Sequence, residues 1–89
     1  MTHQEIVTIQ NSRGLHARAA AKFVKTAGQF EAEVSVRKSG QTVSGLSIMG
    51  LMTLAAGLGS EIEIVATGPE AANALSTLVQ LIEDKFEET

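Results

Sequence analysis

The stretch Phe30-Glu31-Ala32-Glu33-Val34-Ser35-Val36-Arg37 alternates apolar and polar side chains along its whole length. This period of two is typical of a β-strand that packs one face on a core and leaves the other face in water. Turn-forming residues follow at 38–40, and residues 41–43 can form a second, shorter strand. The stretch therefore predicts an antiparallel sheet with helices on one face only.

The flanking sequence supplies two more strands and three helical segments. β-Branched residues at 5–9 and alternation at 61–66 predict the strands. An alanine-rich helix is expected at 17–27, ending before Gly28, and a short apolar helix at 47–55. A last helix is expected to begin at Pro69, with an apolar stripe of Ala71, Leu75, Leu78, Val79, Ile82 and Phe86. The predicted order is β-α-β-β-α-β-α, in a single domain of residues 1–89.

Composition narrows the class of protein. Hydrophobic residues make up 44% of the 89 residues, but Trp, Tyr and Cys are absent, so we expect an aliphatic core without disulfides or thiolate metal sites. No apolar run approaches membrane-spanning length and no signal-peptide pattern is present, which predicts a cytoplasmic protein that does not enter the membrane. A net charge of −3 argues against nucleic acid as the main partner.

His16 stands in Asn11-Ser12-Arg13-Gly14-Leu15-His16-Ala17-Arg18, between the first predicted strand and the alanine-rich helix. At that junction several backbone N–H groups lack intrahelical partners, and together with the helix dipole they favour a bound phosphate. An imidazole can itself accept a phosphoryl group as nucleophile. We therefore predict a phosphate-carrying histidine and no metal site; the alternative is a histidine that only caps the helix.

A basic stripe follows His16 on the same helix, formed by Arg18, Lys22 and Lys25. Such a stripe would steer acidic partner proteins toward the histidine. Arg18 could also donate to phosphoryl oxygens, together with the backbone N–H groups that begin at Ala17. The alternative is an ordinary solvated helix face.

The segment 46–54 is apolar nearly all round and contains two methionines, with Ser47 as a natural N-cap residue. So short a segment cannot bury every side chain against one sheet, which predicts an exposed protein-binding patch. A wholly buried helix is the alternative. This patch also leaves open a non-catalytic adaptor, whereas a ferredoxin-like RNA-binding module is disfavoured because the strands lack stacking aromatic residues.

Two of these motifs carry a family resemblance. Gly14-Leu15-His16-Ala17-Arg18 resembles the active-site motif of the HPr family, the phosphocarriers of the bacterial phosphoenolpyruvate-dependent phosphotransferase system. Ser47-Ile48-Met49-Gly50-Leu51-Met52 resembles that family's regulatory-serine segment. The resemblance implies an α+β fold, an open-faced two-layer sandwich in which three helices cover one face of a four-stranded antiparallel sheet.

The same resemblance implies a function and its partners. His16 would take a phosphoryl group from phosphorylated Enzyme I, on Nδ1, and pass it to an Enzyme IIA protein. Ser47 would be phosphorylated by an HPr kinase/phosphorylase. We expect a monomer without cofactor or metal, whose partner surface comprises Lys22, Lys25, Ile48, Met49, Leu51 and Met52.

One position departs from the family pattern. The residue after the arginine is usually proline in the family, and here it is Ala19, which keeps the helix but loses a preorganised φ. Residues 67–70 also look similar to the nitrogen-related regulatory branch of the family, so sugar uptake and metabolic regulation both stay open as roles.

Overall fold

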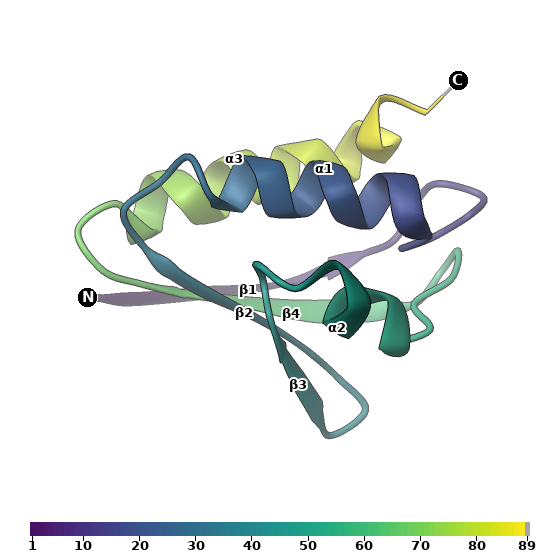
Figure 1. Cartoon of the computed structure of the whole chain (residues 1–89), viewed down its shortest axis with the longest axis horizontal. Coiled ribbons are helices and arrows are strands. Elements are labelled where there is room, and N and C mark those ends of the chain that lie inside the picture. Colours follow the sequence, from purple (N-terminus) through teal and green to yellow (C-terminus); the bar gives the residue numbers. More distant parts are fainter. Residues whose placement is uncertain (89) are drawn as a thin grey trace.

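Four antiparallel strands form one sheet in the order β1-β4-β2-β3. The computed structural model describes residues 1–88 and shows α1 and α3 side by side on one face of that sheet (Figure 1). The elements are β1 (Thr2–Thr8), α1 (Ala17–Ala27), β2 (Glu33–Lys38), β3 (Gln41–Ser44), α2 (Ile48–Thr53), β4 (Glu61–Thr67), α3 (Ala71–Glu83) and a short 3-10 helix, η1 (Lys85–Glu87). The predicted α+β fold class and element order are confirmed.

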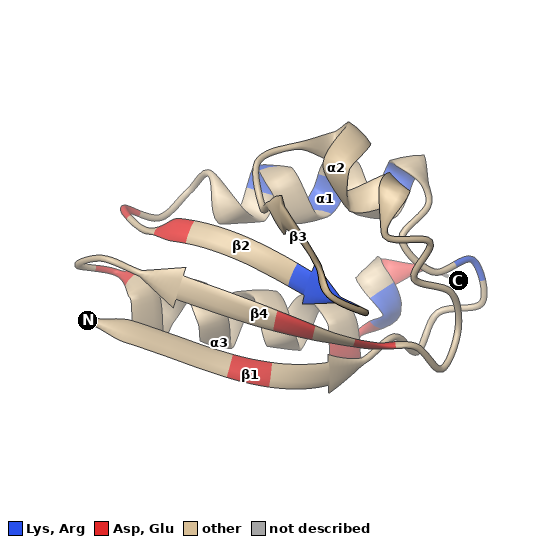
Figure 2. Cartoon of the chain, turned by 90° about the horizontal axis from the view of Figure 1, so that it is seen from below, with Lys and Arg blue, Asp and Glu red and all other residues tan. Residues whose placement is uncertain are grey.

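The register of the strands produces the two different faces of the sheet. β4 lies in the centre, where Ile62 pairs with Val7 of β1 and Ile64 pairs with Val36 of β2. These four side chains are buried under the helices, because side chains alternate between the faces of a strand. On the open face, seen in Figure 2, Arg37 and Glu63 pair across the strands at 3.4 Å.

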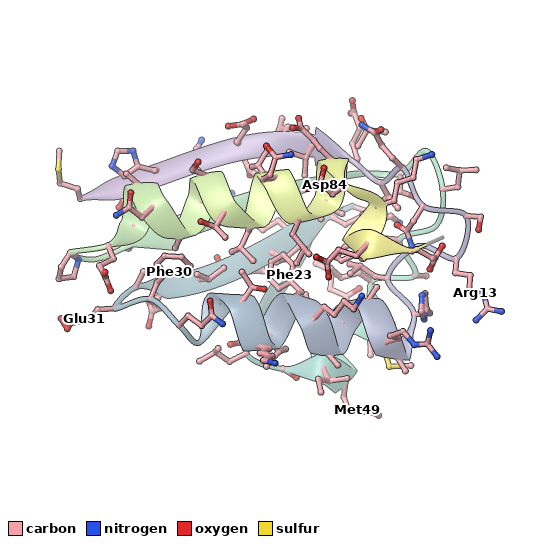
Figure 3. All side chains as sticks on the ribbon, turned by 90° about the horizontal axis from the view of Figure 1, so that it is seen from above. Arg13, Phe23, Phe30, Glu31, Met49 and Asp84 are labelled. Atoms are coloured by element: carbon pink, nitrogen blue, oxygen red, sulfur yellow. The ribbon has the colours of Figure 1, made fainter. Side chains whose placement is uncertain are left out.

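The core lies between the sheet and the helices and is built mostly from small and aliphatic side chains, as predicted, but its two largest buried side chains are Phe23 and Phe86. Figure 3 shows Phe23 of α1 directed toward α3, and its side chain is fully buried. Alanines line the buried faces of both helices, which lets their backbones approach the sheet closely: Ala19, Ala20, Ala27, Ala71 and Ala74. None of the helices within residues 1–88 has the length and apolar character needed to cross a membrane.

Two strands, β1 and β2, begin at residues that differ from the predicted ones. β2 begins at Glu33 instead of Phe30, because residues 28–32 form turns after α1, where the N–H of Phe30 donates to the carbonyl of Ala27 at 3.3 Å. β1 spans Thr2–Thr8 instead of 5–9. Ile9 follows that strand, fully buried, and its N–H still donates to the carbonyl of Ser60 at 2.8 Å.

Both ends of α3 also differ from the prediction. Pro69 lies in a turn, and the helix begins at Ala71 after Glu70. The helix ends at Glu83, so Phe86 belongs to η1 and not to the helical stripe, although its side chain is buried. Residues 85–87 all have positive φ, between 54° and 60°, which is rare outside glycine. This left-handed turn sends the chain back toward the start of α1.

Candidate functional site

His16 is the N-cap residue of α1, as the sequence predicts. Its backbone is extended (φ −77°, ψ 179°), and its carbonyl accepts the first helical hydrogen bond, from the N–H of Ala20 at 2.8 Å. Ring atom Nδ1 accepts a weaker hydrogen bond from the N–H of Arg18 at 3.3 Å. Nδ1 therefore faces the positive end of the helix dipole.

The loop before His16 is held by contacts that leave little freedom. Asn11 is buried, and its Nδ2 donates to the carbonyl of Gly14 at 2.8 Å. Gly14 has φ +63°, and a Cβ there would lie 2.2 Å from the carbonyl oxygen of Ala56, so only glycine fits. The N–H of Leu15 donates to that same carbonyl at 2.9 Å. These contacts position the histidine on a rigid support.

A carboxylate that the sequence analysis did not single out contacts the other ring nitrogen. Oε2 of Glu88 lies 2.9 Å from Nε2 of His16, and both side chains are 23% exposed. The same carboxylate is 3.4 Å from Oγ of Ser12 and 3.5 Å from Nδ2 of Asn11. The hydrogen bond with His16 is the main cause that lowers the pKa of Glu88 below its ordinary 4.5, and Asn11 adds to it.

An open cleft lies between the start of α1 and the turn after α3. Its lining combines both signs of charge around the histidine: Ser12, Arg13, His16, Arg18, Ala19, Lys22, Phe86, Glu87 and Glu88. Arg18 thus borders the same cleft as His16, as predicted. An anion in this cleft would be within the field of three cationic side chains and of two carboxylates, Glu87 and Glu88.

The predicted basic stripe is divided in the structure. Lys22 donates from Nζ to the carbonyl oxygen of Phe86 at 2.8 Å and lies 3.7 Å from Glu87, so it is engaged within the chain. Lys25 is exposed in the last turn of α1 and makes none of the side-chain hydrogen bonds found in residues 1–88. The stripe is therefore not a single free surface for a partner.

α2 presents part of its apolar surface to solvent, as predicted. Ile48, Met49 and Met52 are exposed, Met49 by 73%, and Figure 3 shows Met49 directed away from the core. Leu51 is fully buried, so its prediction as a partner-binding residue is wrong: it faces the core side of a helix that is apolar on both sides. Leu46 of the same segment is 58% exposed as well, although it was not among the predicted partner-binding residues. We call Leu46, Ile48, Met49 and Met52 the apolar patch.

Ser47 caps the helix that carries the apolar patch, and the last residue of the patch, Met52, reaches the histidine. Oγ of Ser47 accepts a hydrogen bond from the N–H of Gly50 at 2.9 Å, the N-cap role that the sequence predicts. Met52 and His16 line one shallow depression together with Ala56. One partner could therefore contact the patch while it reaches the ring.

Known proteins resemble this chain over nearly its whole length. Residues 3–84 match the model of a family described as the PTS HPr component phosphorylation site. Phosphocarrier protein HPr of Cupriavidus necator is 44% identical over 85 residues, which are 96% of each chain. Phosphocarrier protein NPr of Shewanella violacea is 39% identical over 82 residues, 92% of this chain and 90% of that protein. The crystal structure of HPr-C-His from Thermoanaerobacter tengcongensis superposes with a TM-score of 0.93, at 40% identity, over 98% of each chain.

Proposed function

The chain belongs to the HPr family of phosphocarriers, and from this premise we propose that His16 accepts a phosphoryl group from phosphorylated Enzyme I and passes it to an Enzyme IIA protein. The observation that carries the proposal is the position of the ring. His16 caps α1 with Nδ1 toward the helix N-terminus, in an open cleft that a donor can enter.

Nδ1 is the nitrogen that receives the phosphoryl group in this proposal. The bond from phosphorus to Nδ1 forms as the bond to the donor's histidine breaks, and that bond's electron pair stays with the donor nitrogen. Nε2 is already occupied by Glu88 at 2.9 Å, which favours reaction at the other nitrogen. Histidine as the nucleophile needs no metal for this exchange.

The phosphoryl oxygens are held by groups at the start of α1. Ala17 and Arg18 supply backbone N–H groups, and the Arg18 guanidinium, on the same cleft, supplies charged donors. The cleft is open to solvent, so the site would hold phosphate without enclosing it. A carrier needs this balance, because it must release the group to the next protein.

The apolar patch and Arg18 form the proposed docking surface for Enzyme I and Enzyme IIA. Arg18 and Met52 each border the histidine, from different sides. Exposed methionines adapt to more than one partner surface, which suits a protein that meets a donor and an acceptor in turn. We infer a cytoplasmic monomer, acting either in sugar uptake or in metabolic regulation according to the Enzyme IIA that it meets.

Ser47 is the proposed site of regulation by an HPr kinase/phosphorylase. Its hydroxyl is partly accessible at the N-terminus of α2, beside Ile48 and Met49. A phosphate there would complement the helix dipole and would also place roughly two negative charges next to the patch. The expected effect is weaker docking with an intact fold.

Incubation with phosphoenolpyruvate, Enzyme I and labelled phosphate tests the proposal. The wild type should acquire an acid-labile, base-stable label, and His16→Ala should acquire none. The free energy of unfolding of His16→Ala should be lower than that of the wild type by no more than about 1 kcal/mol. His3→Ala is the matched control, because His3 is the other of the 2 histidines and lies on β1, outside the residues that line the cleft. A folded His16→Ala protein that still takes label would refute the proposal, and an unlabelled wild type would favour an adaptor.

A further inference from the structure

Glu88 approaches the histidine from a distant part of the sequence, 72 residues after it. The left-handed turn at residues 85–87 directs the carboxylate to the cleft, and Lys22 holds that turn through the carbonyl of Phe86 at 2.8 Å. Asn11 and Ser12 contact the carboxylate as well, at 3.5 and 3.4 Å. The carboxylate is therefore held against Nε2 by contacts from two separate segments.

An ionised carboxylate can only accept hydrogen bonds. At 2.9 Å from Oε2, Nε2 must therefore carry the ring proton. Nδ1 then carries a lone pair in place of a proton, and this lone pair accepts the weak hydrogen bond from the N–H of Arg18 at 3.3 Å. The two contacts, one on each nitrogen, select the same tautomer.

We propose that Glu88 is a positioning residue for phosphoryl transfer, holding the proton on Nε2 and balancing the positive charge that appears on the ring when Nδ1 takes the phosphoryl group. This inference rests on the proposed function of His16. It assigns a role in that function to a residue beyond the two sequence motifs.

The chemistry of the step gives Glu88 its role. A neutral imidazole that attacks phosphorus through Nδ1 keeps its proton on Nε2 and becomes a cationic phosphoimidazolium. The nearby carboxylate stabilises that cation, as the buried aspartate of a catalytic triad stabilises its histidine. When the phosphoryl group is passed on, the bond from Nδ1 to phosphorus breaks and its electron pair returns to Nδ1. The imidazole is then neutral again and still carries its proton on Nε2. No proton is exchanged with Glu88 in either direction.

Three variants separate the parts of this role. Glu88→Ala removes both the acceptor and the charge, whereas Glu88→Gln keeps an oxygen acceptor and removes only the charge. Glu83→Gln is the matched control, since it makes the same change of charge at an exposed position at the end of α3. Thermal unfolding checks that each variant is folded.

Two measurements are made on each variant. The first is the NMR signal of the proton on Nε2, in ¹⁵N-labelled protein without any phosphoryl donor, because a hydrogen bond to a carboxylate protects that proton from exchange with water. The second is the rate of transfer from phosphorylated Enzyme I. Glu88→Ala should lose the signal and transfer roughly tenfold more slowly, as expected for a lost charged hydrogen bond. Glu88→Gln should keep the signal and transfer at an intermediate rate, and Glu83→Gln should match the wild type in both.

Each other outcome overturns the inference. A Glu88→Ala protein that keeps the Nε2 signal contradicts the positioning role, and one that transfers within twofold of the wild type contradicts the charge-balancing role. Equal slowing in Glu83→Gln would assign the effect to net charge. A wild type that takes no label would overturn the proposed function and this inference with it, whereas a labelled wild type with an unaffected Glu88→Ala variant would overturn this inference alone.

Discussion

Lys22 of α1 donates a hydrogen bond from Nζ to the carbonyl oxygen of Phe86, at 2.8 Å, and so ties the middle of the first helix to the turn after α3. The same ammonium lies 3.7 Å from the carboxylate of Glu87. A lysine of the basic stripe therefore helps to build the cleft instead of standing free for a partner. This contact links the packing of Phe86 in the core to the position of Glu88 at the histidine.

Lys22→Met should loosen the turn at residues 85–88, because it removes the ammonium while it keeps an apolar side chain of similar length. We expect a loss of about 1 kcal/mol in the free energy of unfolding, as for one partly exposed charged hydrogen bond. Hydrogen exchange should accelerate at residues 85–88 and stay unchanged in the sheet. Lys25→Met, the same change on the same helix, is the control, and an equal effect in both variants would contradict a tether at Lys22.

Arg18→Ala should slow phosphoryl transfer about tenfold without preventing it, because charged donors to the phosphoryl oxygens are lost. Arg18→Lys should recover only part of the rate, since an ammonium lacks the planar fork of the guanidinium. The rates are measured with phosphorylated Enzyme I, and Lys38→Ala, at the hairpin between β2 and β3, serves as the control for charge. Unchanged rates in both Arg18 variants would show that this side chain is only part of a solvated helix face.

Phosphorylation of Ser47, or Ser47→Asp as a partial mimic, should weaken binding to Enzyme I with little change in fold, because the added charge lies beside the apolar patch. Ser47→Ala should keep the affinity but cost about 1 kcal/mol of stability, since the side-chain cap on Gly50 is lost. Titration calorimetry of the modified and unmodified proteins measures the affinities. Equal affinities would exclude regulation at the docking step.

Ala19→Pro should be neutral or stabilise the fold by up to about 1 kcal/mol. The first helical hydrogen bond comes from the N–H of Ala20, so within the described residues the N–H of Ala19 has no helical partner to lose. The proline ring would instead restrict φ at position 19 to a value that fits the first turn of the helix. Ala21→Pro is the contrasting variant, because its N–H lies inside the helix, and it should lose about 3 kcal/mol. A comparable loss in Ala19→Pro, measured by thermal unfolding, would contradict the observed start of α1.

The features that the sequence determined by itself depend on near neighbours. The alternation around Val34 and Val36 gives a sheet with one covered face, and its period cannot fit a helix. His16 and Ser47 cap their helices through contacts with Arg18 and Gly50, two and three residues away. Such short-range hydrogen bonds follow from residue type and position, whatever the rest of the chain does.

Other features were decided only by tertiary structure. Leu51 and Met49 are both apolar residues of one short helix, and only the packing of α2 on its neighbours α1 and β3 buries the first and leaves the second exposed. The spacing of Lys22 predicts a place in a solvated basic stripe, but in the folded chain its ammonium donates to the carbonyl oxygen of Phe86, 64 residues away. Glu88 reaches His16 because α3 crosses the sheet beside α1 and a left-handed turn then reverses the chain. Contacts between residues so far apart depend on the packing of whole elements, which local periodicity does not encode.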